Sequence, residues 1–279
     1  MDASIERAAE LIAESQRMVA LTGAGVSTPS GIPDYRSPKS GLWEQAVDMA
    51  EIATIYAFRH RPRAFYEWLR PLLGLIRAAA PNPAHLALAQ LEAAGRLQAL
   101  ITQNIDLLHE RAGSRVIYEL HGHLRDLVCP ACHYLLPADD ALDAFMNDDV
   151  IPVCRRCHHV MKPSVVLFGE MLPRRVTRAA QAAARTADLM LVAGTSLEVA
   201  PAGDLPALAQ AHGARLILIN RGPTRLDDLA DLVIRGDVAE VLPQLAAPWV
   251  NPLPGPLPQG EGTVRPLPNL LPREAGMVR

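Results

Sequence analysis

Short runs of apolar residues alternate with helical stretches along most of this 279-residue chain, and this alternation constrains the fold most. Short apolar runs predict buried strands at 18–21, 165–168, 189–193 and 216–219, and two mostly apolar segments predict further strands at 97–101 and 116–120. Apolar residues at helical spacing predict helices near 5–12, 83–94 and 174–185. Because short buried strands that alternate with helices form parallel sheets, we expect an α/β fold with a doubly wound parallel sheet.

Two stretches interrupt this alternation. Residues 40–80 have a helical pattern and contain most of the aromatic residues, and residues 125–162 contain all four cysteines. We expect these two insertions to form a smaller second domain beside the main sheet. Residues 248–279 contain 8 of the 24 prolines, a composition that sustains neither helix nor sheet and predicts a disordered tail.

Charge and cysteine usage narrow the class of protein. Twenty-seven basic and 30 acidic residues give a formal net charge of −3, which provides no field for nucleic-acid binding. The N-terminal stretch carries Asp2, Glu6 and Glu10 where a signal peptide would be basic and apolar, and no apolar run reaches the roughly 20 residues of a membrane helix. We therefore expect a cytoplasmic protein with reduced thiols and no membrane partner.

The four cysteines form two Cys-x-x-Cys pairs, Cys129/Cys132 and Cys154/Cys157, with 21 residues between the pairs. Two such turns are typical of a tetrahedral zinc site. Four thiolates leave no open coordination position, so we expect one structural Zn²⁺; a redox pair, the alternative, needs only one motif. We expect the three nearby histidines to be exposed and not to be ligands: His133, His158 and His159.

Two glycine-containing segments follow the first predicted strand. Gly23-Ala24-Gly25 could approach a pyrophosphate, but Thr28 stands where a dehydrogenase fingerprint has its third glycine, so dinucleotide binding and a tight structural turn are equally supported. The loop 31–36, with sequence GIPDYR, is either a surface loop or a lid over a cofactor.

Other polar residues follow the later strands, where ligands of parallel sheets bind. Asp106, in the TQNID segment 102–106, is a candidate ligand-binding residue or the cap of a helix. His121 follows a strand and precedes Gly122, a residue that allows a close approach, and a neutral imidazole there suits a general base. Residues 194–196 and Asn220 could hold phosphate, ribose or adenine, or form caps and turns.

In this order, the segments resemble the sirtuins, a family of NAD-dependent protein lysine deacylases, and in particular its compact bacterial members. The resemblance covers about residues 1–247 and is carried by GAGVS, GIPDYR, TQNID, HG, both cysteine pairs, KPSVVLFGE (162–170), GTSLEVAPA (194–202) and residues 236–238. It implies a Rossmann-like large domain of about 1–39, 81–124 and 163–247. It also implies a small zinc-ribbon and helical domain of about 40–80 and 125–162.

The resemblance also implies a role for individual residues. His121 would be the general base, with Asn104 and Asp106 as further catalytic residues and Asp106 holding the nicotinamide carboxamide. The NAD site would comprise Gly23, Ala24, Gly25, Thr28, Asp34, Tyr35, Arg36, Gln103, Asn104, Ile105, Asp106, His121, Gly194, Thr195, Ser196, Asn220, Arg221, Asp237 and Val238. The acyl-lysine peptide would pair as an added strand with Val166, Leu167, Phe168, Gly169 and Glu170.

The implied reaction transfers an acyl group from lysine to NAD-derived ADP-ribose, releasing nicotinamide and 2′-O-acyl-ADP-ribose. Relatives that remove acidic acyl groups have Tyr-x-x-Arg in the helical insertion; here Leu69 stands at that spacing after Tyr66, and Arg70 follows one position late. Neutral acyl groups, acetyl first, are therefore expected. The alternatives are protein ADP-ribosylation at the same site and a non-catalytic NAD-binding or interaction module.

Overall fold

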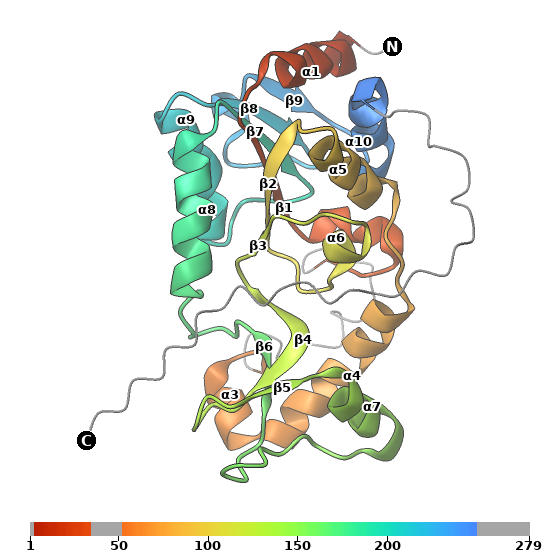
Figure 1. Cartoon of the computed structure of the whole chain (residues 1–279), viewed down its shortest axis with the longest axis vertical. Helices are drawn as coiled ribbons and strands as arrows, with labels where there is room; N and C mark the ends of the chain where they lie inside the picture. The colour runs from red at the N-terminus through yellow and green to blue at the C-terminus, as the bar shows by residue number, and fades with distance from the viewer. Residues whose placement is uncertain (1–2, 35–51, 250–279) are drawn as a thin grey trace, which may run out of the picture.

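The computed structural model describes residues 3–34 and 52–249. Its larger sheet has six parallel strands in the order β3-β2-β1-β7-β8-β9 (Figure 1). The strands are β1 (Met18–Thr22), β2 (Leu97–Thr102), β3 (Ile117–Glu119), β7 (Leu189–Ala193), β8 (Arg215–Ile219) and β9 (Leu232–Ile234). In chain order this is the 3-2-1-4-5-6 arrangement of the Rossmann fold, which confirms the predicted doubly wound sheet.

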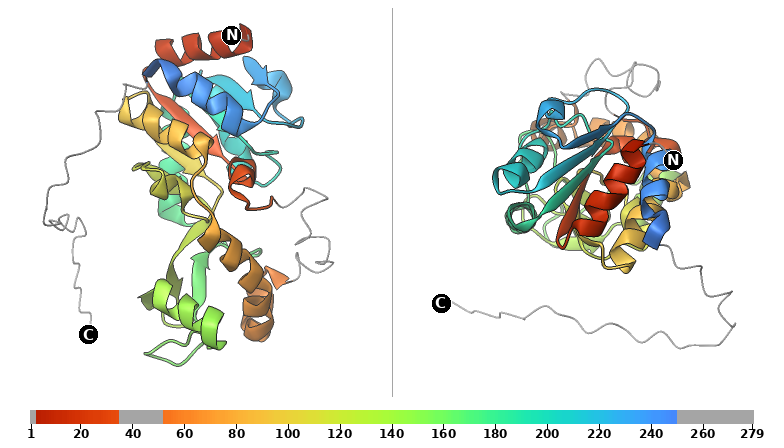
Figure 2. Two further views of the ribbon diagram at one scale, coloured as in Figure 1. Left: turned by 90° about the vertical axis from the view of Figure 1, so that its right-hand side faces the viewer. Right: turned by 90° about the horizontal axis from the view of Figure 1, so that it is seen from above.

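Helices cover both faces of this sheet (Figure 2). Side chains alternate along β1, so Met18 and Ala20 join one apolar cluster and Val19 and Leu21 join another. The first cluster includes side chains of α1 (Ala3–Glu14), α5 (Pro83–Ala93) and α10 (Val238–Ala246), and the second those of α8 (Arg174–Thr186) and α9 (Leu205–Ala211). The sheet is thus buried on both faces, as its unbroken apolar strands require.

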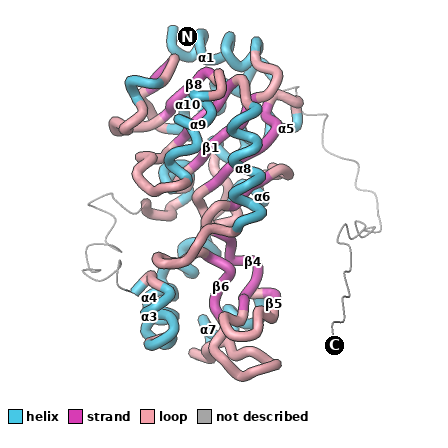
Figure 3. The backbone as a smooth tube through the Cα atoms, turned by 90° about the vertical axis from the view of Figure 1, so that its left-hand side faces the viewer, coloured by secondary structure: helices cyan, strands magenta, loops and turns pink. Residues whose placement is uncertain are grey.

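A second sheet of three antiparallel strands lies at the other end of the molecule (Figure 3). Its order is β5-β4-β6, formed by β4 (Gly122–Val128), β5 (Leu135–Pro137) and β6 (Lys162–Val165). Around it lie α3 (Ile55–His60), α4 (Pro62–Ala78) and α7 (Asp139–Asp148), which share one apolar cluster with the sheet. The rings of Phe58, Phe65, Tyr66 and Phe145 contact one another within that cluster.

The prediction that 165–168 is a strand of the parallel sheet is wrong. The strand in this region is β6, which ends at Val165 and pairs antiparallel with β4. Phe168 forms only an isolated bridge with Thr54, its side chain is 54% exposed, and Gly169 turns the chain with a φ of 87°. Val165 and Leu167 are buried in the apolar cluster of the smaller region and not in the parallel sheet, which is why the apolar pattern misled.

Some predicted features lie outside the described residues: Tyr35, Arg36, the first part of the 40–80 insertion and the tail from residue 250. Within the described ranges, no helix combines the length and apolar character needed to cross a bilayer.

Candidate active site

The carboxyl ends of the parallel strands gather most of the predicted site residues at one edge of the sheet. The connections after β1 and β7 run to opposite sides, so a topological switch point lies between these two strands. Ligands of open α/β sheets bind in the crevice outside such a point. The loops that converge here begin at Gly23, Gln103, Leu120, Gly194 and Asn220, directly after β1, β2, β3, β7 and β8.

The glycine turn after β1 packs tightly against the loop after β7. Gly25 N donates to Gly194 O at 2.8 Å, and a Cβ at Gly25 would come within 2.8 Å of that same oxygen. A Cβ at Gly23 would lie 2.7 Å from the Cβ of Thr195. These contacts directly support the tight-turn interpretation, because the glycines let two backbones meet at the switch point.

Asp106 is buried at the centre of a hydrogen-bond network. Its Oδ2 accepts from Ser27 Oγ at 2.6 Å, and its Oδ1 accepts from Leu108 N at 2.9 Å, so the carboxylate also caps the turn that starts α6 (Leu108–Arg111). Burial raises the pKa of Asp106, and these two hydrogen bonds oppose the rise. Asp106 therefore caps the helix through Oδ1 only, while its Oδ2 is hydrogen-bonded to Ser27.

Asn104 is held beside this network by its amide nitrogen. Nδ2 donates to Ser27 Oγ at 3.0 Å and to Gly23 O at 3.1 Å. Both protons of the amide are used, so its carbonyl oxygen is the group available to a ligand.

Two histidines lie behind Ser27, and the sequence reasoning missed both. His85 Nδ1 accepts from Asn82 N at 3.3 Å, so its Nε2 carries the proton and faces Ser27 Oγ at 3.4 Å. The ring of His109 lies 4.7 Å from that of His85. Burial lowers the pKa of His85 to about 4 and that of His109 well below its usual value, so both are neutral at pH 7. The available signal was the position of His85, three residues after the helix cap Asn82.

His121 has the geometry of a neutral base. Its Nδ1 lies 2.9 Å from the carbonyl oxygen of Gln103, which can only accept, so Nδ1 carries the proton and Nε2 has a free lone pair. Burial lowers the pKa of His121, and the Gln103 contact opposes this only in part. Gln103 Nε2 in turn donates to Thr195 Oγ1 at 3.1 Å, which joins the loops after β2 and β7.

Gly122 places the smaller sheet against His121. Its φ is 75°, and a Cβ there would lie 2.0 Å from the carbonyl oxygen of Ser164 on β6. The predicted close approach at this glycine is confirmed, and the approaching group is backbone of the smaller sheet. His121 O also accepts from Val166 N at 2.8 Å, which fixes the candidate base relative to the candidate peptide segment.

Within the candidate peptide segment, Glu170 has a structural partner. Its Oε2 accepts from Lys162 Nζ at 2.9 Å and from Leu167 N at 2.8 Å. Burial lowers the pKa of Lys162, and Glu170 opposes that change. Phe168 N and O are paired with residues 53 and 55, whereas Gly169 is exposed and makes no backbone hydrogen bond within the described ranges. Glu170 and Lys162, whose role the sequence did not indicate, therefore hold this turn in shape.

The remaining candidates make local contacts. Thr28 Oγ1 donates to Gly25 O at 3.0 Å, and Asn220 Nδ2 to Gly222 O at 3.0 Å. Asp237 caps α10 through Ala239 N at 2.8 Å and pairs with Arg221 at 2.5 Å. Three other candidates are half-buried: Ala24, Ile105 and Ser196. Val238 is buried at the start of α10, and Asp34 lies in the loop after β1.

The four cysteines meet at the far end of the smaller sheet. Their Sγ atoms all lie within 4.8 Å of one another, and three of the separations are 3.4, 3.6 and 3.4 Å. Thiolates around a tetrahedral Zn²⁺ lie about 3.8 Å apart, so this cluster fits that ion. Each turn has the same form: His133 N donates to Cys129 O and His158 N to Cys154 O, both at 2.9 Å. As expected, the three neighbouring histidines are exposed: His133, His158 and His159.

Comparisons with known proteins agree with this geometry. The model of the Sir2 family matches residues 23–201. An NAD-dependent protein deacylase 2 of Archaeoglobus fulgidus is 44% identical over 88% of this chain and 96% of its own length. An NAD-dependent protein deacetylase of Thermotoga maritima is 40% identical over 83% of this chain and 92% of its own.

Solved structures show the same similarity. A chain described under "Structural Basis for the Mechanism and Regulation of Sir2 Enzymes" superposes with a TM-score of 0.82 at 43% identity, covering 89% of this chain and 98% of that one. A second, described as "Sir2-p53 peptide-NAD+", has a TM-score of 0.79 at 38% identity and covers 88% of this chain and 98% of its own.

Proposed function

The chain belongs to the Sir2 family, and we infer from this premise that it is an NAD-dependent protein lysine deacylase. Its co-substrate is NAD, and its substrates are acyl-lysine peptides and proteins. Its structural ion is Zn²⁺, held by the four cysteines. The carboxyl edge of the parallel sheet and the turn after β6 supply the candidate residues for this reaction.

We propose His121 as the general base that activates a ribose hydroxyl. The observation that carries this role is the Nδ1–Gln103 O contact of 2.9 Å, which leaves Nε2 unprotonated. The lowered pKa keeps the imidazole neutral near pH 7, the form that accepts a proton. NAD would supply the ribose carbon that loses nicotinamide as it becomes joined to the acyl oxygen, and Nε2 would take the proton of the ribose hydroxyl that then accepts the acyl group.

Asp106 and Asn104 are proposed to line the nicotinamide pocket. The Asp106 carboxylate accepts from Ser27 and Leu108, and Asn104 is pinned by two hydrogen bonds, so both side chains are oriented before a ligand arrives. Ser27 and His85 act as positioning residues for this pair. Burial of Asp106 supports a dry pocket, which favours cleavage of the nicotinamide bond by position rather than by a strong acid.

The NAD site is proposed to extend along the carboxyl edge of the sheet, through the other NAD-site residues predicted from the sequence. Tyr35 and Arg36 remain predictions of the sequence alone. For the peptide, the free backbone groups of Gly169 support pairing with an added strand, and the exposed Phe168 side chain supports an apolar contact beside it.

A neutral acyl group is supported by the partners of Tyr66 and Arg70. The Tyr66 hydroxyl donates to Met161 O at 2.6 Å, and Leu69 is buried in the apolar cluster. Arg70 contacts Asp149 and donates to Met146 O at 2.9 Å, so its charge is already compensated. No free cation at these positions is available for an acidic acyl chain.

The division into a large domain and a small domain, with the predicted boundaries, remains a proposal. So does a cytoplasmic location, which is supported by four free thiols arranged for a metal rather than for disulfides.

The decisive experiment incubates the full chain with acetyl-lysine peptide and NAD and follows nicotinamide release. Release should require both substrates, and His121→Ala should lower kcat by at least about 100-fold, the usual size of a general-base effect. His123→Gln is the matched control, because His123 lies two residues away and its Nδ1 has no hydrogen-bond partner in the described part of the chain.

The pH dependence gives a second readout. Because the base must be neutral and its pKa is lowered, kcat should be level near pH 7 and should fall only as the pH drops below about 6.5. Full activity in His121→Ala would contradict the assignment. Labelled ADP-ribose on protein without deacylated peptide would instead favour the transferase alternative.

A further inference from the structure

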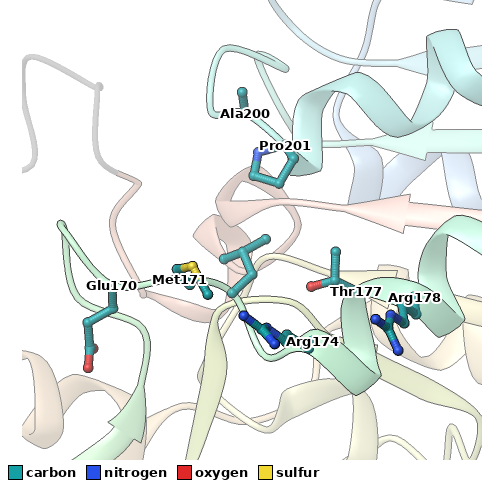
Figure 4. A pocket seen from close by; sticks show the side chains of 8 residues that line it. Glu170, Met171, Arg174, Thr177, Arg178, Ala200 and Pro201 are labelled. Atoms are coloured by element: carbon teal, nitrogen blue, oxygen red, sulfur yellow. The ribbon is translucent and has the colours of Figure 1, made fainter.

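A cavity of about 450 Å³ adjoins the candidate peptide segment. Its walls come from the turn after Gly169, from the first turns of α8 and from the loop after β7 (Figure 4). The lining residues are Glu170, Met171, Leu172, Arg174, Thr177, Arg178, Ala200 and Pro201. The cavity begins at Glu170, directly after Gly169. The backbone groups of Gly169 make no hydrogen bond in the described ranges, so a peptide strand that pairs with them would pass the mouth of the cavity.

The charged groups on the α8 side of this cavity are two arginines that have no partner among the described residues. Arg174 and Arg178 stand four residues apart, on one face of the helix, and both are exposed. No ion pair or hydrogen bond joins either guanidinium to the described residues, whereas most other arginines of this part of the chain have such partners. The helix itself carries no acidic residue that could compensate them.

The acidic groups nearby do not cancel this charge. Glu170 lines the same cavity, but its carboxylate accepts from Lys162 and from Leu167 N, and it lies at the other end of the lining residues in Figure 4. Glu198, in the loop that leads to Ala200, has a partner of its own. Met171 is 71% exposed and offers an apolar surface between Glu170 and Arg174.

We propose that Arg174 and Arg178 select acyl-lysine substrates that carry acidic side chains close to the acylated lysine. This inference rests on the proposed function and adds a substrate class to it. Guanidinium groups bind carboxylates through paired N–H donors, and residues of an extended strand are about 3.3 Å apart, so side chains within three positions of the lysine are within reach. The pairs are solvent-exposed, so each contributes modestly and is weakened by salt.

The test compares acetyl-lysine peptides that differ only in flanking residues, with Glu, Gln or Lys within three positions on one side or the other. At about 50 mM NaCl, kcat/KM should be about three- to tenfold higher for Glu than for Gln on one side, with Lys the poorest. The difference should lie in KM, with kcat nearly unchanged, and should shrink at 500 mM NaCl.

The double variant Arg174→Glu/Arg178→Glu should reverse the order of the Glu and Lys peptides. Arg185→Glu is the matched control, because Arg185 is exposed on the last turn of the same helix, away from the cavity, and should retain the wild-type preference. The Gln peptide reports on folding, because all three proteins should turn it over with the same kcat.

Two failures are distinguishable. If the Gln peptide is turned over but Glu and Lys peptides have equal kcat/KM, or the double variant keeps the wild-type order, substrate selection by these arginines is overturned. If no peptide releases nicotinamide from the wild-type protein, the proposed function itself fails.

Discussion

The two sheets differ in how much of their stability comes from apolar burial. Every residue of β1 and β7 is buried, and apolar clusters cover both faces of the parallel sheet. In the smaller sheet, β5 has no buried residue and β4 alternates buried with partly exposed positions. Its apolar cluster already includes Cys129 and Cys154.

This difference explains why the cysteine cluster lies in one region and the proposed NAD site in the other. The parallel sheet supplies a rigid edge on which loops meet without help from an ion. The smaller sheet has few buried positions of its own, so cross-linking of the two cysteine turns by an ion contributes stability there. The aromatic contacts among Phe58, Phe65, Tyr66 and Phe145 supply the rest.

The largest expected effect is on the metal site. Cys154→Ser, or chelation, should unfold the smaller region while the parallel sheet remains folded, because structural zinc binding amounts to about 10–16 kcal/mol in small modules. Hydrogen exchange should accelerate in β4, β5 and β6 and stay slow in β1, β7 and β8. Deacylation should be lost with it.

Arg155→Ser is the control for this variant, since Arg155 is exposed between the second pair of cysteines and has no hydrogen bond or ion pair with the described residues. Equal exchange rates in the two regions after chelation would show that the smaller sheet does not depend on the ion.

The close contact between β4 and β6 beside His121 gives the next largest effect. Gly122→Ala would place a Cβ 2.0 Å from Ser164 O at a φ of 75°, so β6 must move, and His121 with it. We expect a loss of about 3–5 kcal/mol in the free energy of unfolding, together with loss of activity.

Gly95→Ala is the matched control for the strained backbone. Gly95 has a φ of 71°, but a Cβ there meets nothing within 4 Å, so the cost should be only about 1–2 kcal/mol, with activity retained. If the two variants lose equal stability in urea denaturation, the close approach at Gly122 has no special importance.

The sequence predicted the parallel sheet well, because strands buried on both faces leave unbroken apolar runs such as 189–193. It also predicted that the segments after these strands gather at one edge, since parallel topology brings all carboxyl strand ends there. The half-exposed strands were harder: β4 has no apolar run, and β9 has only three residues, two of them partly exposed.

Contacts between side chains distant in sequence were the part that could not be predicted. Ser27, His85 and Asp106 belong to three separate segments, and only the folded chain brings their polar groups together. Glu170 was expected at the peptide because of its motif, yet its carboxylate turns back to Lys162. Periodicity indicates which face is buried and does not indicate which partner a polar group finds there.

A smaller effect is expected from one hydroxyl in the core of the smaller region. Tyr66→Phe removes the 2.6 Å hydrogen bond to Met161 O and leaves that buried carbonyl unpaired, at a cost of about 1–3 kcal/mol. Tyr118→Phe is the same change in the larger region, where the hydroxyl has no hydrogen bond to the described residues, and should change stability little. Equal urea midpoints for the two variants would contradict the assigned importance of this bond.

The smallest effect tests the polar contact that closes the larger region. Asp188, just before β7, accepts from Ser15 Oγ and from the N–H groups of Gln16 at 2.9 Å and Arg17 at 3.0 Å. Burial opposes its charge, yet these hydrogen bonds hold the pKa of Asp188 below its usual value. The stabilisation is therefore present above the unfolded pKa of about 3.9 and is lost as the pH falls through the lower folded value.

Asp188→Asn should cost about 1–2 kcal/mol at pH 7, and its difference in stability from wild type should shrink below pH 4. The exposed Asp228→Asn should show neither change. A pH-independent difference would mean that the carboxylate charge contributes nothing and that only the shape of the side chain matters at this end of the sheet.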